Sequence, residues 1–163
     1  MSTRSETGGY MTEDRRMIQQ SARDFAMREV LPVANRLDPE QGDIPMALRD
    51  KMAEMGYFGI TIDEKYGGLG LGCFEYCLVA EELARAWMSV ASIIARGNGM
   101  IGFDAMSEAQ RAEIMPRVAS GQYLGAFSMS EPNAGSDVAN ISCRARRDGD
   151  DWLITGNKYW CTF

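Results

Sequence analysis

Apolar residues recur at helical spacing along most of the chain, and this pattern stops at Gly121. Thr12 has the position of an N-cap before the first such segment, and Ser107 with Gln110 has the capping-box pattern before the last. Each segment presents an apolar stripe that has to be buried against another helix. The region from about residue 12 to 120 therefore predicts an up-and-down helical bundle, and the fold class is mainly α.

Strand patterns follow Gly121, and Asp148-Gly149-Asp150 predicts a turn between two of them. Four segments have apolar runs or alternation typical of strands: 123–127, 141–145, 152–154 and 158–162. We expect the first strands of an antiparallel β-domain, incomplete because the chain stops inside a strand. The predicted domains are 1–121 and 122–163. The chain is then the amino-terminal piece of a longer protein, or its partner strands come from elsewhere.

Three features predict interruptions in the helical region. Pro32 and Pro39 predict the end of the first helix, because proline lacks the N–H that an interior helical residue donates. The apolar run from Tyr57 to Ile62 predicts a strand. Three closely spaced glycines, Gly97, Gly99 and Gly102, predict that the chain leaves regular helix there.

The glycine-rich segment from Tyr66 to Gly72 invites comparison with a dinucleotide-binding fingerprint. The fingerprint fails, because counting from Gly68 its third glycine falls on Cys73, and counting from Gly70 it falls on Glu75. The segments that follow are helical, without a second strand that ends in an acidic residue. We interpret the loop as a chain reversal.

The loop after the first predicted strand has the residue types of a ligand-binding loop. Pro132 ends the strand, and the short residues that follow let another molecule approach the main chain. Gly135 can adopt positive φ, and the hydroxyls of Ser130 and Ser136 suit an anionic or heteroaromatic ligand. An ordinary loop between two strands is an equally good interpretation of the composition.

Two motifs resemble those of one enzyme family. Residues 130–137 read Ser-Glu-Pro-Asn-Ala-Gly-Ser-Asp, and residues 154–162 read Ile-Thr-Gly-Asn-Lys-Tyr-Trp-Cys-Thr. The first is similar to the signature of the acyl-CoA dehydrogenases, and the second is similar to their β-hairpin that ends in Trp-x-Thr. The helical region also resembles the amino-terminal domain of that family.

The resemblance implies an oxidoreductase that removes the α-proton and the β-hydride of an acyl-CoA thioester, with FAD as cofactor. By resemblance, one group of residues binds the cofactor: Phe127, Met129, Ser130, Gly135, Ser136, Trp160 and Thr162. Phe127, Met129 and Ser130 border the isoalloxazine, Trp160 packs against it, and the Thr162 hydroxyl reaches toward N5. Gly135 and Ser136 approach the cofactor and the CoA portion of the substrate.

The catalytic glutamate of the family lies in a carboxy-terminal helical domain, so no residue of this chain is assigned as the catalytic base. Glu131 does not match it, and Glu29, Glu75, Glu81 and Glu82 are interpreted as helix-face or capping carboxylates. We therefore expect the 163-residue chain itself to be inactive. The resemblance further implies an electron-transferring flavoprotein as partner and a homotetramer or homodimer.

The family places the helix through Ser92 at the acyl end of the substrate. Ser92 then indicates a short or polar-substituted acyl group, and Arg96 is a candidate partner for a substrate carboxylate. A structural role for Arg96 at the carboxyl end of its helix is the alternative and the favoured interpretation.

Charge and composition exclude several other classes. With a net charge of −6 and a pI of about 4.7, the chain has no Lys/Arg stripe for nucleic acid. The chain has no histidine, which excludes a Cys/His metal site and a Ser-His-Asp nucleophile. Cys73 and Cys77 are expected to share one buried helix face as reduced structural thiols. No apolar run has the length of a membrane span, and the first residues lack the apolar core of a signal peptide, so we expect a cytoplasmic protein.

Two alternatives to a dehydrogenase stay open. Acyl-CoA oxidases have the same fold and motifs and differ in letting oxygen reach the reduced flavin. The other alternative is a module without catalytic activity that binds acyl-CoA or a partner protein. The absence of an assigned base favours such a module, and the motifs at the flavin edge favour the enzyme.

Overall fold

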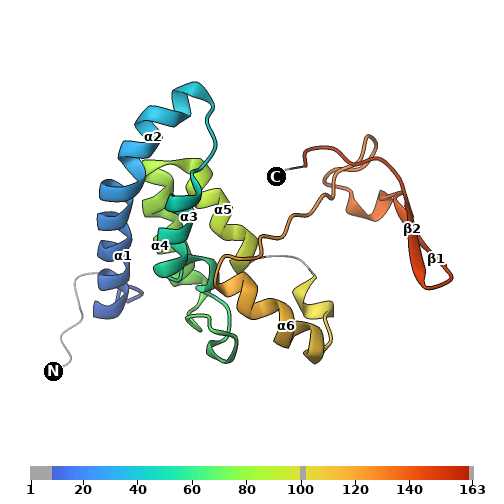
Figure 1. Cartoon of the computed structure of the whole chain (residues 1–163), viewed down its shortest axis with the longest axis horizontal. Helices are drawn as coiled ribbons and strands as arrows, with labels where there is room; N and C mark the ends of the chain where they lie inside the picture. Colours follow the sequence, from blue (N-terminus) through green and yellow to red (C-terminus); the bar gives the residue numbers. More distant parts are fainter. Residues whose placement is uncertain (1–8, 100–101, 162–163) are drawn as a thin grey trace. The chain divides into compact units, whose positions relative to one another are not determined.

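The computed structural model describes residues 9–99 and 102–161 and divides the chain into two compact units (Figure 1). We call Met1–Gly125 the helical unit and Ala126–Phe163 the β unit. The elements are α1 (Glu13–Phe25), α2 (Leu31–Leu37), α3 (Met46–Glu54), α4 (Cys73–Ala86), α5 (Met88–Asn98), α6 (Glu108–Ala119), β1 (Arg144–Asp148) and β2 (Asp151–Thr155). The mainly α fold class is confirmed, whereas the domain bounds 1–121 and 122–163 stay a prediction.

The helical path begins at the predicted cap and continues beyond α1, past Pro32. The Thr12 hydroxyl accepts a hydrogen bond from the Arg15 N–H at 3.2 Å. A π-helical turn, Ala26–Val30, then joins α1 to α2, where Pro32 occupies the first turn. The prediction that Pro32 ends the helix is wrong, because the π-helical turn, in which the Leu31 N–H donates to the Ala26 carbonyl, carries the helical path into α2. The helical path ends at Leu37, just before the 3₁₀ turn that contains Pro39.

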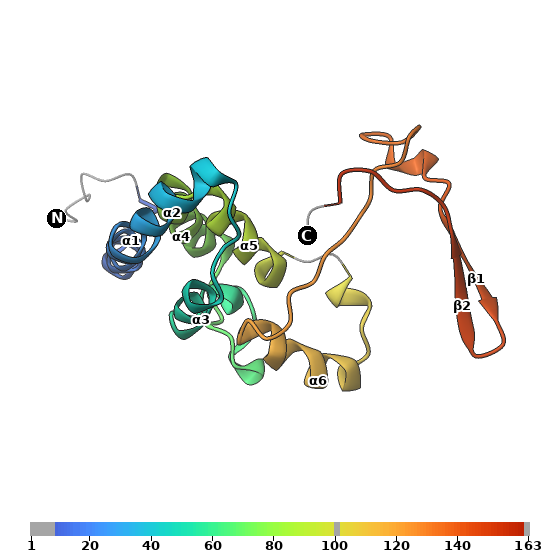
Figure 2. The same ribbon diagram turned by 45° about the horizontal axis from the view of Figure 1, so that its top comes forward.

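Helix α4 lies between α1 and α5 and packs against both (Figures 1 and 2). The larger core is formed by these helices with α3 and the 57–59 turn, and its fully buried members include Met52, Phe58, Leu83 and Ile94. Trp87 joins α4 to α5, is buried, and donates its indole N–H to Asp38 Oδ1 at 2.7 Å. Within residues 9–99 and 102–161, no helix combines the length and apolar character needed to cross a membrane.

The apolar run from Tyr57 to Ile62 is a 3₁₀ turn and further turns, so the strand predicted there is wrong. Main-chain N–H groups of the glycine-rich loop donate hydrogen bonds to the carbonyl groups of this segment. The Leu69 N–H donates to the Gly59 carbonyl and the Leu71 N–H to the Ile60 carbonyl, both at 2.8 Å. The buried run thus obtains its hydrogen bonds from a loop in place of a neighbouring strand. Because those N–H groups are occupied, they are not free for a phosphate, which agrees with the chain-reversal interpretation.

Helix α5 ends at Asn98 with Gly99 as its C-cap, so the predicted end of the helix is confirmed at Gly99, whereas Gly97 lies inside the helix. A Cβ at Gly97 would lie 2.0 Å from the carbonyl oxygen of Phe58. The glycine is therefore needed for α5 to pass close to the main chain of the 57–59 turn.

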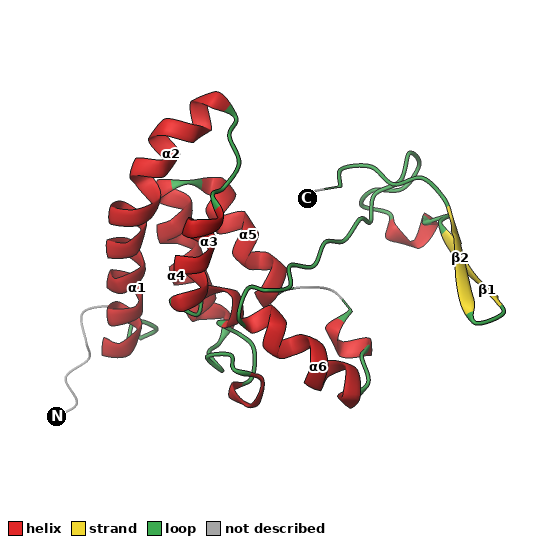
Figure 3. Cartoon of the chain, viewed as in Figure 1, coloured by secondary structure: helices red, strands yellow, loops and turns green. Residues whose placement is uncertain are grey.

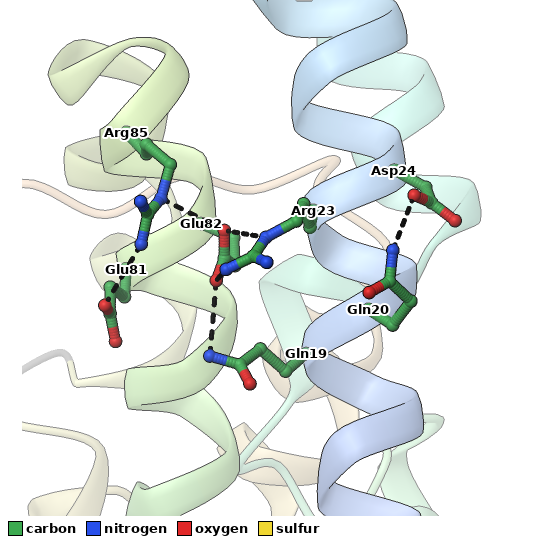
Figure 4. A network of polar contacts seen from close by, with 7 residues as sticks. All are labelled: Gln19, Gln20, Arg23, Asp24, Glu81, Glu82 and Arg85. Carbon is green, nitrogen blue, oxygen red and sulfur yellow. Dashed lines mark hydrogen bonds and ion pairs between the residues drawn. The ribbon is translucent and has the colours of Figure 1, made fainter.

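A buried carboxylate joins α1 to α4 (Figure 4). Glu82 is 1% exposed and accepts hydrogen bonds from Arg23 Nε at 3.0 Å and Arg23 Nη2 at 2.8 Å. Gln19 donates at 3.2 Å, and Arg85 Nε lies at 3.3 Å. The hydrogen bonds from Arg23 hold the pKa of Glu82 below its ordinary value. Glu82 is thus a buried carboxylate that pairs with two exposed arginines, beyond the helix-face role expected from the sequence.

The four cysteines are free, but Cys73 and Cys77 are exposed and not on a buried face. The buried face of α4 consists of Leu78, Val79, Glu82 and Leu83. The spacing of four residues does put both cysteines on one side of the helix, and that side is the outer one.

The β unit contains an antiparallel hairpin in which Arg144 pairs with Thr155 and Asp148 with Asp151 (Figure 3). Gly149 has φ of 65°, which confirms the predicted turn. All ten strand residues are exposed, including Trp152 at 64%. No regular strand forms at 123–127 or in the described residues 158–161, so those two strand predictions are wrong. The positive φ of Trp160, 58°, is incompatible with an extended strand there.

Candidate functional site

The two motif segments of the β unit lie against each other. The Tyr159 N–H donates to the Ser130 carbonyl at 2.8 Å, and Lys158 Nζ donates to the Met129 carbonyl at 2.9 Å. Ser128 Oγ and Cys161 Sγ lie 2.9 Å apart. These contacts are consistent with one antiparallel register, in which residue 128 is opposite residue 161 and residue 130 is opposite residue 159. Residue 129 is then opposite residue 160.

The Glu131 side chain is buried at the base of this pairing. Its Oε2 accepts from the Ser142 N–H at 2.7 Å and the Ser142 hydroxyl at 2.6 Å. Its Oε1 accepts from the Cys143 N–H and from Lys158 Nζ, at 2.8 and 2.9 Å. The carboxylate thereby connects three segments of the β unit that are distant in sequence.

These hydrogen bonds also set the charge of Glu131. The Ser142 hydroxyl and then the Lys158 ammonium lower the pKa of Glu131 to about 2. A carboxylate that four donors engage at such a low pKa is a poor acceptor for a substrate proton. That Glu131 is not the catalytic base stays a prediction. Its anchoring role was missed by the sequence interpretation.

Apolar side chains around the paired segments are open to solvent. Phe127, Met129 and Tyr159 are exposed, and Trp160 is 87% exposed. Ser130, which follows Met129 in the sequence, is half-buried. Exposed aromatic and thioether groups next to a hydroxyl suit a planar heteroaromatic ligand with polar edges.

Gly135 does not use the positive φ that a glycine can adopt. The space where a Cβ would be is open, with no atom of the described chain within 4 Å. Neither backbone conformation nor packing against residues 9–99 and 102–161 therefore explains a glycine at this position. Ser136 next to it is exposed.

The remaining predicted site residues lie elsewhere. Ser92 and Arg96 are half-buried positions on α5 of the helical unit. Thr162 lies outside the described residues. The β unit thus brings together Met129, Ser130 and Trp160, while the role of each predicted site residue stays a prediction.

The helical unit contains an apolar hollow of about 320 Å³ between α1, the end of α3 and the 69–71 loop. Tyr57 lines it, and burial raises the pKa of Tyr57 to about 12. Among the residues that line the hollow, the only charged one is Asp14. This lining suits packing against an apolar group and offers no acid–base pair, so we do not assign a reaction to it.

Sequence comparison decides the family. Residues 12–122 match the family model for the acyl-CoA dehydrogenase N-terminal domain, and residues 126–163 match the model for the middle domain. The chain belongs to the acyl-CoA dehydrogenase family. The resemblance carried by residues 130–137 and 154–162 is therefore confirmed.

Individual acyl-CoA dehydrogenases resemble the chain over most of its length. A (2S)-methylsuccinyl-CoA dehydrogenase from Cereibacter sphaeroides is 38% identical over 154 residues, which cover 93% of this chain and 28% of that protein. The acyl-CoA dehydrogenase of Geobacillus kaustophilus has a TM-score of 0.83 and 32% identity, over 94% of this chain and 40% of that one. A glutaryl-CoA dehydrogenase from Mycobacterium smegmatis in complex with FADH2 has a TM-score of 0.84 and 30% identity, over 96% and 41%. The chain spans less than half the length of these three relatives.

Proposed function

We propose that this chain is part of an FAD-dependent acyl-CoA dehydrogenase that carries out α,β-dehydrogenation of an acyl-CoA thioester. The observation that carries the proposal is the pairing of residues 128–131 with 158–161, which leaves Met129 and Trp160 exposed beside Ser130. The open space in front of Gly135 supports the proposal, since a bound group can approach the main chain there. These residues fit the edge of a flavin.

In this proposal, the predicted cofactor-binding residues in and near the paired segments have separate roles. Phe127 and Met129 border the isoalloxazine, and the Ser130 hydroxyl donates to its ring edge. Trp160 packs against the ring, and the Thr162 hydroxyl binds near N5. Gly135 and Ser136 contact the cofactor and the CoA portion of the substrate.

The division of chemistry follows from those roles. The bound FAD would supply the acceptor for the hydride that leaves the β-carbon. The residues of this chain orient the ring and the substrate and exclude water from them. We assign the proton-abstracting base to no residue of this chain, and the Glu131 carboxylate in particular is engaged in four hydrogen bonds.

The test uses the FAD-loaded holoprotein that carries this chain, as the wild type and as the variants Trp160→Ala and Ser130→Ala. We expect weaker FAD binding and slower reduction of the flavin by an acyl-CoA in both variants, with Gly9→Ala, an exposed site in the helical unit, unchanged. Oxygen added after anaerobic reduction separates the alternatives. Slow reoxidation supports the dehydrogenase, fast reoxidation supports an oxidase, and acyl-CoA binding without any flavin reduction supports the non-catalytic module.

The acyl specificity is proposed from α5. Ser92 favours a short or polar-substituted acyl group, and Arg96 is a candidate partner for a terminal carboxylate. Turnover of a carboxylated and a plain short acyl-CoA is compared before and after Arg96→Ala. A selective loss on the carboxylated substrate supports the assignment, and equal losses on both remove it.

The partners belong to the same proposal. We propose that electrons pass to an electron-transferring flavoprotein, that the protein is a homotetramer or homodimer, and that it is cytoplasmic. Reduction of added electron-transferring flavoprotein, light scattering of the purified protein and cell fractionation test the three statements separately.

A further inference from the structure

The Lys158 side chain connects the two motif segments through its charge. Its ammonium donates to Glu131 Oε1 and to the Met129 carbonyl, both at 2.9 Å, and the side chain is 23% exposed. A half-buried lysine whose ammonium has a carboxylate and a carbonyl as acceptors has little freedom to move. The position of Lys158 is thus set by the 129–131 segment.

Glu131 is itself held in place from a third segment. Ser142 and Cys143, 11 and 12 positions further along the chain, donate to both of its oxygens. The Glu131 side chain is 3% exposed, so any rotation away from these donors would leave a buried charge without partners. The Glu131 carboxylate is therefore held in one position, and Lys158 binds to it there.

Trp160, two positions after Lys158, has a backbone that needs such a restraint. Its φ of 58° is a left-handed conformation that bulky residues rarely adopt. Such conformations persist only when the surrounding structure imposes them. The Trp160 side chain is 87% exposed, so its own packing does not impose the conformation. The nearest contacts that can do so are those of Lys158 with Glu131, Tyr159 with Ser130, and Cys161 with Ser128.

We propose that Glu131 is a positioning residue that fixes Lys158, and through it the main chain at Trp160, so that Met129 and Trp160 face the flavin in one arrangement. The inference rests on the proposed function, because it assigns the flavin to this face. It gives Glu131 a role in the reaction that requires no contact with substrate.

The experiment compares Glu131→Gln, Lys158→Met and Lys158→Arg in the FAD-loaded holoprotein that carries this chain. We expect the first two to shift the visible absorption bands of the flavin and to raise the FAD dissociation constant by about tenfold. We expect kcat to fall by about 10- to 100-fold with KM little changed, the size of effect that a misplaced reacting group has. Lys158→Arg keeps the charge and should recover most of both losses.

Lys51→Met is the matched control, because it removes a lysine–glutamate ion pair with Glu29 on the surface of the helical unit. It should leave the flavin spectrum and kcat unchanged. If Glu131→Gln fails to fold, Lys158→Met and Ser142→Ala each remove one partner of Glu131 and decide the question. A lower melting temperature in these variants, with flavin spectrum, FAD affinity and kcat all at the wild-type level, overturns the positioning role.

The wild-type protein distinguishes this failure from a failure of the proposed function. If the wild type binds FAD and oxidises an acyl-CoA while the variants match it, only the positioning role is wrong. If the wild type binds no FAD, the proposed function fails and the positioning role fails with it.

Discussion

At the scale of single residues, Gly97 is the position where one added carbon atom should do the most harm. Gly97→Ala would put a Cβ 2.0 Å from the Phe58 carbonyl oxygen, a main-chain atom that cannot turn away. We expect the free energy of unfolding to fall by about 3 kcal/mol, the upper part of the usual range for overpacking. Urea denaturation followed by far-UV circular dichroism measures it.

Gly99→Ala is the control for that substitution. A Cβ at Gly99 would lie 3.7 Å from the nearest atom, the Ala95 carbonyl oxygen, and φ there is −142°. Its free energy of unfolding should stay within about 0.5 kcal/mol of the wild type. Equal effects of the two substitutions would show that α5 does not depend on the close approach at Gly97.

Local hydrogen bonds could be predicted from single residues, and distant ones could not. The Ser107 and Gln110 capping box is present as the sequence indicated, because its partners are three positions apart. The role of Glu131 depends on donors 11 and 27 positions away, in Ser142 and Lys158. No spacing rule connects such residues, so only the folded chain reveals the anchor.

At the scale of elements, the contact of α1 with α4 depends on the Glu82 carboxylate. Glu82→Gln removes the charge that Arg23 and Arg85 face, and we expect a loss of about 1–3 kcal/mol of unfolding free energy at pH 7, as for hydrogen bonds to a charged group. Glu81→Gln is the matched control. Glu81 is exposed and lies 3.4 Å from Arg85, so its removal should cost less than about 1 kcal/mol.

The same carboxylate predicts a dependence of stability on pH. The pKa of Glu82 is lowered from 4.5 in the folded chain, chiefly by the hydrogen bonds from Arg23, so below pH 4.5 the unfolded chain binds the proton more readily. The contribution of Glu82 to stability is therefore complete above pH 4.5 and disappears as the pH falls through the folded pKa. The free energy of unfolding, measured by denaturation at several pH values from 7 to 3, should fall less with decreasing pH in Glu82→Gln than in the wild type. Parallel curves would contradict the assignment.

Helices with strong periodicity and caps could be predicted, whereas short apolar runs could not be assigned. The segment from Tyr57 to Ile62 has the composition of a strand, but its hydrogen bonds come from the 69–71 loop. Pro32 was interpreted as a helix end, although a π-helical turn places it at the start of a new helix. In both cases the neighbouring main chain decides the outcome, and periodicity does not carry that information.

At the scale of the whole molecule, the two units should differ in their protection from solvent exchange. The core of the helical unit contains fully buried residues such as Leu83 and Ile94, whereas every residue of β1 and β2 is exposed. A two-stranded hairpin is at best marginally stable in water. In a polypeptide of residues 1–163, amides of 144–155 should exchange orders of magnitude faster than those of α4 and α5, as hydrogen-exchange mass spectrometry measures. Equal protection would mean that another part of the polypeptide covers the hairpin.

The distribution of the three tryptophans gives the molecule separate optical reporters. Trp87, 5% exposed, lies in the helical unit, while Trp152 and Trp160, 64% and 87% exposed, lie in the β unit. Buried indole fluoresces at shorter wavelength than indole in water, so the blue side of the emission spectrum follows the helices and the red side follows the two exposed rings. An external quencher such as iodide should extinguish the red component first. One unlabelled sample can thus report on each unit separately as it melts or binds.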